Sequence, residues 1–370
     1  MDARAPAKII ELRSDTFTLP TAEMLQAITT AQLGNDGYGE DPTVHRLESL
    51  AARKLGVEAS CLLASGTMAN LASLLAHANS RPLMAVLGDQ SDLFIYEDKT
   101  IATALGVIFS PVTTKKDGTL GISELRNKLE EAADRKISAV ICIENPHNLC
   151  CGVVLGVDYL VDVGELARRY NAKFHLDGAR LFNAAVALGV GAPEIVGAAD
   201  SVQFCLSKGL SAPVGSIVGG SRNFIGRLRE KRKILGGEMR QAGIIAAAGI
   251  VALEQMVEAL RTDHAHAREL AEGLAQLAGV ELDLQRVQTN TVVFRINDSR
   301  FSTESFIEAA WSRGLRLSEF KQGRIRAVVH SGIDEADIVL ALAIFRDLLT
   351  TESESPTLPT LPWNEPSSNP

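Results

Sequence analysis

The stretch AKFHLDGARLFNAAVAL, residues 172–188, contains a strand-like apolar run, a turn and a helical pattern in direct succession. The apolar run ends at Leu176, and after Arg180 the apolar residues recur at helical spacing. A strand that leads directly into a helix is the repeating unit of a parallel sheet covered by helices. These residues therefore predict an α/β fold. We expect Asp177 and Arg180 at the carboxyl edge of the sheet, where ligands bind in such folds, although an Asp-Gly pair can also be a plain turn.

The same alternation extends on both sides, over residues 61–218. The other strand-like runs are CLLA (61–64), LMAVL (83–87), GVIFSPV (106–112), ISAVICI (137–143), SVQFCL (201–206) and GSIVGG (215–220). Residues 291–349 then show strand, helix, strand and helix patterns, which predict a small α+β domain. We expect a flexible N-terminus (1–9), a large domain with an N-terminal arm (10–250), a small domain (251–350) and a disordered tail rich in Pro and Ser (351–370).

Composition and charge restrict the class of function. The 370 residues have a formal net charge of −8 and no block of Lys or Arg long enough to form a basic stripe, which argues against a nucleic acid or an anionic membrane as partner. No apolar run reaches the roughly 18 residues of a membrane span, and the N-terminus lacks a signal-peptide core. We therefore expect a cytoplasmic protein. Its five cysteines, an odd number without a CxxC pair, are expected to be reduced.

Two further segments contain groups that suggest chemistry. In CLSKG (205–209), Lys208 follows an apolar run and precedes a glycine. Most lysines are solvated surface charges, but one at a strand end can be a desolvated nucleophile. In ASGTMAN (64–70), Gly66 and Thr67 begin a helix whose first amides can bind an anion, although a plain helix start needs no ligand. An anion cup, a strand-end carboxylate and an amine are together what pyridoxal phosphate (PLP) requires.

Eight longer segments extend this pattern over residues 10–350, where the chain resembles the L-threonine aldolase and β-eliminating lyase family of fold-type-I PLP enzymes. The segments are LRSDTFTLPTAEM (12–24), GYGEDPTVHRLE (37–48), SGTMANL (65–71), ENPHN (144–148), HLDGARLFNAAVALG (175–189), CLSKGLSAPVGS (205–216), GGEMRQAGIIAAAG (236–249) and RIRAVVH (324–330). The resemblance implies an aspartate-aminotransferase-like fold, PLP as cofactor, and a dimer or tetramer whose active sites are shared between subunits.

The resemblance also implies which residues hold the cofactor. Lys208 matches the lysine that forms the Schiff base, and Asp177 matches the partner of the pyridine nitrogen. Gly66 and Thr67 match the phosphate cup. Arg240 matches an arginine that reaches the phosphate from a neighbouring subunit.

A second set of residues matches the substrate side of the family's site. Ser14, Arg180 and Arg326 match groups that bind the substrate carboxylate, a task that suits guanidinium groups because they can bind it bidentately. Tyr38 and Glu97 match residues that line the site. The implied partner is a small amino acid.

Four positions depart from the family's pattern. Asp92 stands where the family has a histidine that stacks on the cofactor and approaches the substrate's β-hydroxyl. Asp134 falls, in a loosely aligned stretch, where a second histidine is expected. Pro146 and Val329 each replace a threonine. The cofactor side is therefore complete while the substrate side is altered.

The reaction that the resemblance implies is retro-aldol cleavage of a β-hydroxy-α-amino acid, such as L-threonine, L-allo-threonine or phenylserine, to glycine and an aldehyde. Asp92, or a water that it positions, is the candidate base for the β-hydroxyl proton. Because the histidine is absent, racemisation of a small amino acid or β-elimination, with Lys208 as base, stays an alternative.

Two other classes of function are disfavoured. A non-catalytic binding or regulatory subunit would not need both Lys208 and Asp177. A Rossmann dehydrogenase would have GxGxxG after an early strand, which is missing. We expect no catalytic metal, and a structural cation near Thr16, Thr18 and Ser207, which some family members hold, stays open.

Overall fold

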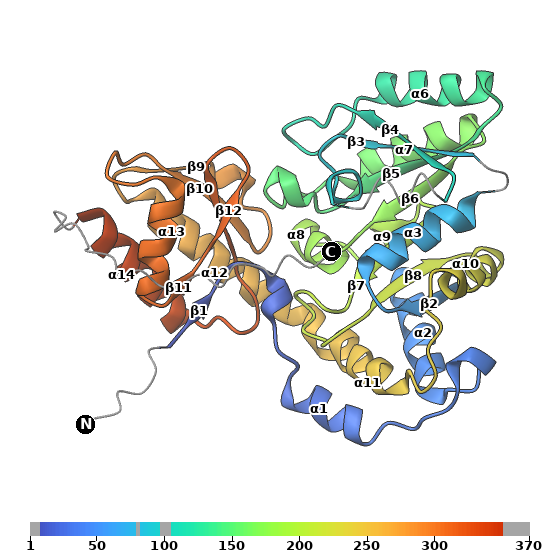
Figure 1. Cartoon of the computed structure of the whole chain (residues 1–370), viewed down its shortest axis with the longest axis horizontal. Helices are drawn as coiled ribbons and strands as arrows, with labels where there is room; N and C mark the ends of the chain where they lie inside the picture. Colours follow the sequence, from blue (N-terminus) through green and yellow to red (C-terminus); the bar gives the residue numbers. More distant parts are fainter. Residues whose placement is uncertain (1–7, 79–81, 97–104, 351–370) are drawn as a thin grey trace, which may run out of the picture.

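A computed structural model describes residues 8–78, 82–96 and 105–350 of the chain. The expected disordered tail, nearly all of the expected flexible N-terminus, and Glu97 lie outside these residues. Figure 1 shows a large domain and a smaller one, joined by a long helix.

The large domain is built around a seven-stranded, mostly parallel sheet in the order β2-β8-β7-β6-β5-β3-β4. Among the described strands of this sheet, β8 runs in the direction opposite to the other six. The strands are β2 (Ala59–Leu63), β3 (Leu83–Gly88), β4 (Val107–Val112), β5 (Ser138–Glu144), β6 (Lys173–Asp177), β7 (Ser201–Cys205) and β8 (Ser216–Gly220). Each corresponds to a predicted strand, so the predicted α/β fold with a mostly parallel sheet is confirmed.

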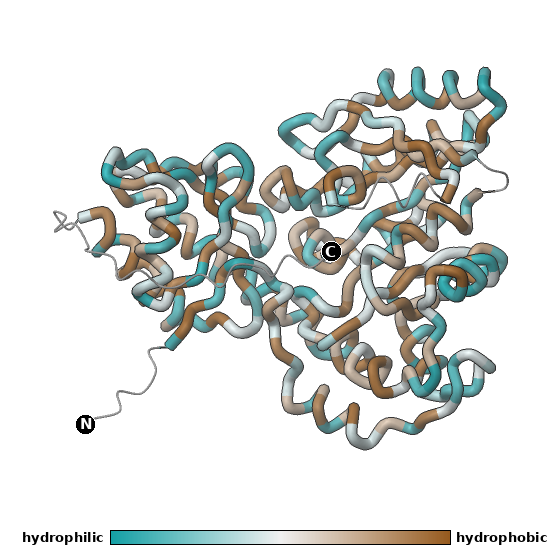
Figure 2. Tube along the Cα trace, in the orientation of Figure 1, coloured by the Kyte–Doolittle hydropathy of each residue, from teal (hydrophilic) through white to brown (hydrophobic). Residues whose placement is uncertain are grey.

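Helices cover both faces of this sheet (Figure 1). Alternate residues of each strand point to opposite faces, and both faces are apolar over most of their length. The helices of the large domain are α1 (Ala22–Thr29), α2 (Pro42–Leu55), α3 (Gly66–His77), α4 (Asp92–Ile95), α6 (Ile122–Asp134), α7 (Val157–Arg169), α8 (Leu181–Leu188), α9 (Ala192–Val196) and α10 (Arg222–Ile234). Figure 2 shows the resulting brown, apolar strands between helices that alternate brown and teal.

The small domain contains a four-stranded antiparallel sheet in the order β12-β13-β10-β9. Its strands are β9 (Val280–Leu282), β10 (Thr291–Ile296), β12 (Ser318–Phe320) and β13 (Arg324–Val328), and its helices are α13 (Thr303–Ser312) and α14 (Glu335–Thr350). The predicted small α+β domain is thus confirmed. Strand β1 (Ile10–Glu11) pairs with β11 (Leu315–Arg316), so the first residues of the expected arm contribute a strand to the small domain.

One continuous helix joins the two domains. It comprises α11 (Gly243–Val251), a π-helical turn at Ala252–Met256 and α12 (Val257–Ala275). It is long and apolar enough to cross a membrane by length and composition, but 56% of its most apolar window is buried inside the fold, and core helices pass the same test. Helix α11 packs on α1 and α2, whereas α12 packs on α8 of the large domain and on α14 and β10 of the small one.

Candidate active site

Several predicted site residues of the large domain lie at the carboxyl edge of its sheet. In register across this edge, Glu144 at the end of β5 lies beside Asp177 at the end of β6, and Asp177 lies beside Gln203 of β7. Lys208 follows β7, and its backbone oxygen accepts hydrogen bonds from Thr18 Oγ1 (3.0 Å) and the amide of Ser211 (2.8 Å). The loop that holds the lysine is therefore fixed from two sides.

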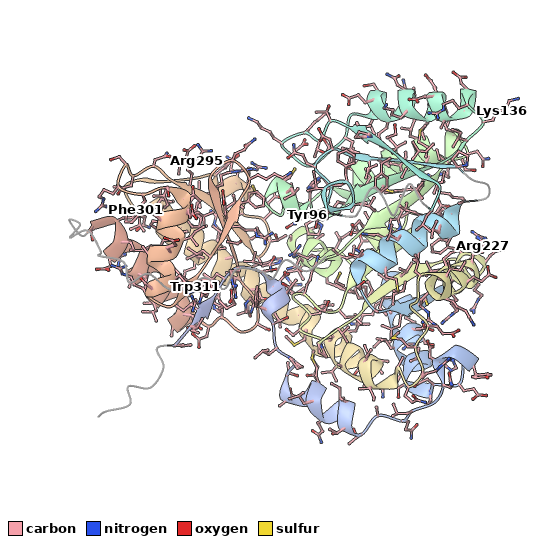
Figure 3. All side chains as sticks on the ribbon, in the orientation of Figure 1. Tyr96, Lys136, Arg227, Arg295, Phe301 and Trp311 are labelled. Carbon is pink, nitrogen blue, oxygen red and sulfur yellow. The ribbon has the colours of Figure 1, made fainter. Side chains whose placement is uncertain are left out.

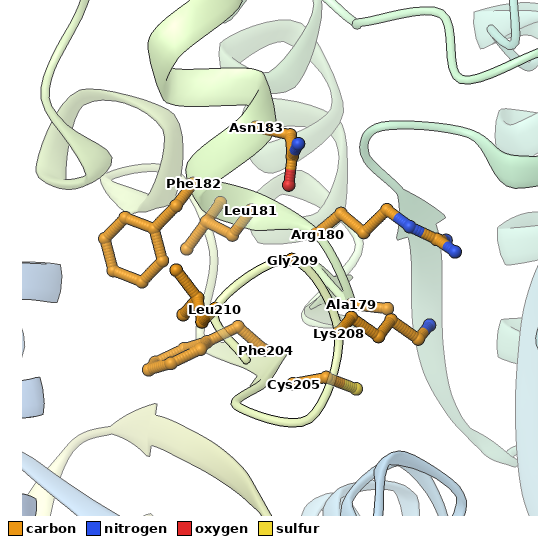
Figure 4. Close-up of a pocket in the computed structure, with 10 residues that line it drawn as sticks. All are labelled: Ala179, Arg180, Leu181, Phe182, Asn183, Phe204, Cys205, Lys208, Gly209 and Leu210. Carbon is orange, nitrogen blue, oxygen red and sulfur yellow. The ribbon is translucent and has the colours of Figure 1, made fainter. Parts of the chain in front are cut away.

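Lys208 and Arg180 extend from separate loops toward the same side of a small pocket (Figure 4). Both side chains project past Ala179, and Cys205 lies on the lysine's side of the pocket. An amine and a guanidinium so placed can act on the same small anionic molecule.

Asp177 is a buried carboxylate with three hydrogen-bond donors. Asn70 Nδ2 donates to Oδ2 (2.9 Å), while Gln203 Nε2 (2.5 Å) and the amide of Ala179 (3.2 Å) donate to Oδ1. Burial raises the pKa of Asp177, and the charge of Asp92 adds to the rise. Lys208 and the two amide side chains oppose it. A cationic N–H beside this carboxyl would stabilise its charged form.

The start of α3 forms an open anion cup. Ser65 caps the helix, because its Oγ accepts from the amide of Met68 (3.2 Å). Ser65 and Thr67 are not buried, so the first turn of the helix is open to solvent. A Cβ added to Gly66 would lie 3.0 Å from Cys205 Sγ, so this position favours glycine. The cup therefore suits a phosphate group, since a helix N-terminus with free amides attracts anions.

Arg180 is held by Asp15, a residue that the sequence analysis did not single out. Arg180 Nε donates to Asp15 Oδ2 and Nη2 donates to Oδ1, each at 2.7 Å, and both side chains are buried. Burial alone would raise the pKa of Asp15, but the charge and hydrogen bonds of Arg180 lower it. The paired geometry fixes the plane of the guanidinium, and among the described residues its Nη1 has no hydrogen-bond partner, so a further ligand could bind there.

Arg326 reaches the same region from the small domain. Its Nη1 donates to Asn148 Oδ1 (3.1 Å) and its Nη2 to the backbone oxygen of Arg13 (3.2 Å). Burial lowers the pKa of Arg326, and the positive charge of Arg180 lowers it further. Because the two positive guanidinium groups repel each other, an anion bound beside both would stabilise their charged forms.

Ser14 stands at the start of the short helix that contains Asp15. Its Oγ accepts from the amide of Thr16 (3.2 Å) and from Thr16 Oγ1 (3.0 Å).

Thr18 Oγ1 also bonds within the protein, to Asp15 O and Lys208 O. Within the described residues, no group of three or more His, Cys, Asp or Glu side chains could hold a metal ion.

Asp92 lies in the first turn of α4 and faces the same site. Asn148 Nδ2 donates to both of its carboxylate oxygens, at 3.0 and 3.2 Å. Its charge acts on the pKa of Asp177, Arg180 and Arg326. Asp92 therefore lies where a group could act on a bound substrate.

Glu144 braces Asp92 and Asn148 through their backbone. Its Oε2 accepts from the amide of Asp92 (2.8 Å) and its Oε1 from the amide of Asn148 (2.7 Å). Burial raises the pKa of Glu144 well above its ordinary value, and the charges of Asp92 and Asp177 add to this. Neither Glu144 nor Asn148 was predicted from the sequence to have a role, although both belong to the ENPHN segment.

Tyr96 also lies near Asp92, although it was not predicted from the sequence as a site residue. It is 66% exposed; partial burial of its hydroxyl and the charge of Asp92 raise its pKa, and the charge of Arg326 opposes this rise. In Figure 3 it lies on the side of the large domain that faces the small one. Its position after Asp92 in the segment DLFIY was the available signal.

Three expected residues do not join this cluster within a single chain. Tyr38 is 78% exposed, and the side chain of Arg240 is 61% exposed and pairs with Glu238 at 3.4 Å. Asp134 is exposed at the end of α6, before the amino end of β5, so the interpretation that it replaces a site histidine is wrong. Chain direction explains the error, because the loop before a parallel strand lies at the sheet edge opposite to the ligand-binding one.

Known proteins resemble this chain in sequence over most of its length. The β-eliminating lyase family matches residues 11–298. A low-specificity L-threonine aldolase of Arabidopsis thaliana is 40% identical over 93% of this chain and 98% of its own length. The low-specificity L-threonine aldolase of Escherichia coli K12 is 40% identical over 78% of this chain and 85% of its own.

Solved structures agree in fold. A threonine aldolase of Leishmania major superposes with a TM-score of 0.77 at 16% identity, over 91% of this chain and 99% of the other. A serine palmitoyltransferase of Sphingomonas wittichii gives 0.71 at 16% identity, over 92% and 86%. The predicted fold type is confirmed.

Proposed function

Because the chain belongs to the β-eliminating lyase family, we propose that it is a PLP-dependent aldolase that cleaves β-hydroxy-α-amino acids to glycine and an aldehyde. The observation that supports this most is that Lys208, Asp177, Arg180, Arg326 and Asp92 meet at one sheet edge. The 40% identity to low-specificity L-threonine aldolases over nearly the whole chain supports the same reaction.

The residues around Lys208 fit PLP. The Lys208 amine would hold the cofactor covalently, Asp177 would accept the N–H of its ring, and the amides of Gly66 and Thr67 would bind its phosphate. When bound, PLP supplies an electron sink for the bond broken at the substrate's Cα. The absorbance that the cofactor gives when joined to Lys208 should appear in the purified protein and be absent from Lys208→Ala.

The two arginines and Ser14 would bind the substrate carboxylate. Asp15 fixes Arg180 and Asn148 fixes Arg326, so both guanidinium groups are oriented before the substrate arrives. Preorganised donors bind an anion without a further ordering cost. This contact would place the substrate's β-carbon on the side where Asp92 lies.

Asp92 would take the proton from the β-hydroxyl. As this O–H bond breaks, its electron pair forms the carbonyl of the aldehyde and the bond between Cα and Cβ breaks. A proton returned to Cα then gives glycine. The Asn148 amide holds the Asp92 carboxylate in a single orientation throughout. A position within reach of the proton is the first requirement for a general base.

Racemisation or β-elimination is the second candidate, because a carboxylate stands where the family has a histidine. In that case Lys208 would remove the proton at Cα. A product assay with L-threonine, L-allo-threonine and phenylserine separates the reactions. Glycine and an aldehyde support the aldolase, whereas their absence with all three substrates would refute it. Racemised alanine, or ammonia with a keto acid, would support the second candidate. Asp92→His should change the rate or the preference among substrates.

We also propose a cytoplasmic dimer or tetramer in which Tyr38 and Arg240 complete a neighbouring subunit's site. Their exposure supports this, as does their proximity, because a Cβ on Gly37 would lie 2.9 Å from Arg240 Nη1. Lys208→Ala and Arg240→Ala should each be inactive. Coexpressed, they should regain activity, because each mixed pair of subunits contains one intact site. No recovery in verified mixed oligomers would refute the shared site.

A further inference from the structure

A second group of polar side chains lies behind Asp177, on the sheet face covered by α3. His175 precedes Asp177 by two residues on β6, so both point to this face. Ser201 is the register partner of His175 on β7. Asn70 and His77 are seven residues apart on α3 and therefore share one side of that helix. All five side chains are at most 4% exposed.

These side chains form an unbroken series of hydrogen bonds. Asn70 Nδ2 lies 2.9 Å from Asp177 Oδ2, and Asn70 Oδ1 lies 3.1 Å from His175 Nε2. His175 Nδ1 lies 2.8 Å from Ser201 Oγ, which lies 2.6 Å from His77 Nε2. The series starts at the candidate cofactor site and ends at His77. The ring of His77 stacks on that of Phe224, with the two ring centroids 4.4 Å apart.

The charge of Asp177 determines the direction of every bond in the series. An ionised carboxylate only accepts, so the NH₂ of Asn70 must face it and the amide oxygen must face His175. His175 then donates from Nε2, and its Nδ1 accepts the hydroxyl proton of Ser201. Ser201 in turn accepts from Nε2–H of His77. Each donor therefore points toward Asp177.

Burial supports this assignment. It lowers the pKa of His175 to about 3 and that of His77 well below the ordinary value, so both rings are neutral. A neutral imidazole has one donor and one acceptor nitrogen, as the series requires. The remaining nitrogen, His77 Nδ1, is buried without a hydrogen-bond partner among the described residues.

We propose that Asn70, His175, Ser201 and His77 form a positioning series that keeps Asp177 an ionised acceptor for the ring nitrogen of the cofactor. The proposal rests on PLP binding at Lys208. The hydroxyl of Ser201 is the decisive element, because it selects the tautomer of His175. Without that hydroxyl, His175 can hold its proton on Nδ1 and no longer donates to Asn70. The amide is then free to turn its oxygen toward Asp177, which disfavours the charged carboxylate.

The test compares two buried serines. Ser201→Ala removes the hydroxyl from the series, whereas Ser73→Ala removes one that donates only to Ala69 O (2.7 Å) in its own helix. Both serines are at most 1% exposed. Solid-state NMR of holoenzyme containing isotope-labelled histidine and PLP reports the tautomer of His175 and the protonation of the cofactor ring. Titration of cofactor-free protein gives the dissociation constant of PLP.

In the unsubstituted protein we expect His175 to be neutral with its proton on Nε2. In Ser201→Ala that signal should split between tautomers, the ring nitrogen should shift toward its unprotonated form, and kcat should fall about tenfold, the equivalent of one pKa unit. The dissociation constant of PLP should rise by a similar factor. Ser73→Ala should leave the ring nitrogen unchanged whatever its stability. An unchanged ring nitrogen in Ser201→Ala, or an Nδ1–H tautomer of His175 in the unsubstituted protein, would overturn the proposal.

Two further measurements cover the cases in which Ser201→Ala does not fold or the protein binds no PLP. If Ser201→Ala does not fold, His77→Phe preserves the aromatic contact with Phe224 and removes only the last donor. It should produce a smaller shift of the ring nitrogen in the same direction, and no shift would count against the series. If the unsubstituted protein takes up no PLP, the proposed function fails, whereas the histidine tautomers still report on the series itself.

Discussion

Replacing Asp92 by asparagine tests the proposed base with little change in shape. The amide oxygen introduced at this position can still accept from Asn148 Nδ2, so the side chain should keep its place. What is lost is the ability to take a proton. We therefore expect Asp92→Asn to lower kcat for aldol cleavage and to leave the cofactor in place.

The contacts of Asp92 set the size of this effect. Loss of a general base costs about 10² to 10⁴ in rate. Asn148 donates to both oxygens of Asp92. One of these hydrogen bonds must weaken when the carboxylate takes a proton, and this loss offsets part of the rate gain that the base provides. We therefore expect the lower end, a fall in kcat of about 10²-fold, or about 2.7 kcal/mol in the barrier. Because the charge of Asp92 raises the pKa of Asp177, PLP binding should not weaken.

Steady-state kinetics with L-threonine and phenylserine, together with cofactor titration, measure both effects. Asp89→Asn is a matched control on the same loop, because Asp89 Oδ1 accepts from the amide of Thr114 (2.9 Å) and asparagine can do the same. Asp89→Asn should therefore leave kcat unchanged. If Asp92→Asn retains more than half of the original kcat, Asp92 is not the base. A loss of PLP in parallel with kcat would show a structural role instead.

Three further predictions concern binding and stability. Asp15→Asn should raise KM about tenfold with the cofactor absorbance unchanged, because Arg180 loses a charged partner; a fall in kcat alone would contradict this. Gly66→Ala should weaken PLP binding about tenfold in a titration of cofactor-free protein, because the added Cβ meets Cys205 Sγ at 3.0 Å; equal affinity would show that the cup tolerates a side chain. Burial lowers the pKa of His147 to about 4 and of His175 to about 3. Unfolded histidine titrates near 6.5, so stability is present above about pH 6.5 and falls by about 1.4 kcal/mol per pH unit per histidine below it. Because the raised pKa of Glu144 gives the opposite slope, the histidine contribution is measured as the difference in urea unfolding between the unsubstituted protein and His147→Gln from about pH 7 to pH 5; equal slopes in the two proteins would contradict neutral burial of His147.

Local patterns in the sequence were sufficient for the architecture and for the position of Asp177 and Lys208 at one edge of the sheet. The run from Ala172 to Leu188 predicted a strand, a turn and a helix, and the structure has β6 and α8 there. Asp177 and Lys208 were predicted at one edge of the sheet because each follows an apolar strand, and the carboxyl ends of parallel strands lie at the same edge. These predictions depend on periodicity and chain direction, which a single sequence shows.

Contacts between distant segments could not be predicted in the same way. Asp15 meets Arg180 across 165 positions, and Asn148 meets Arg326 across 178. Whether such pairs meet depends on strand register and on the relative placement of the two domains. Asp134 was misplaced because a loose alignment cannot tell which edge of the sheet a loop occupies.

The π-helical turn Ala252–Met256 gives the helix that joins the domains a spare residue. A π turn accommodates one more residue than the path of an α-helix requires. Deleting one residue within it would let the helix become regular while both ends keep their faces. Deleting one residue from α12 would instead rotate everything beyond it by about 100°, since each residue turns the helix by that amount. Arg326 would then lose its contact with Asn148 while Lys208 and Asp177 stayed in place. The protein would therefore still bind its cofactor but would bind the carboxylate of the amino acid more weakly.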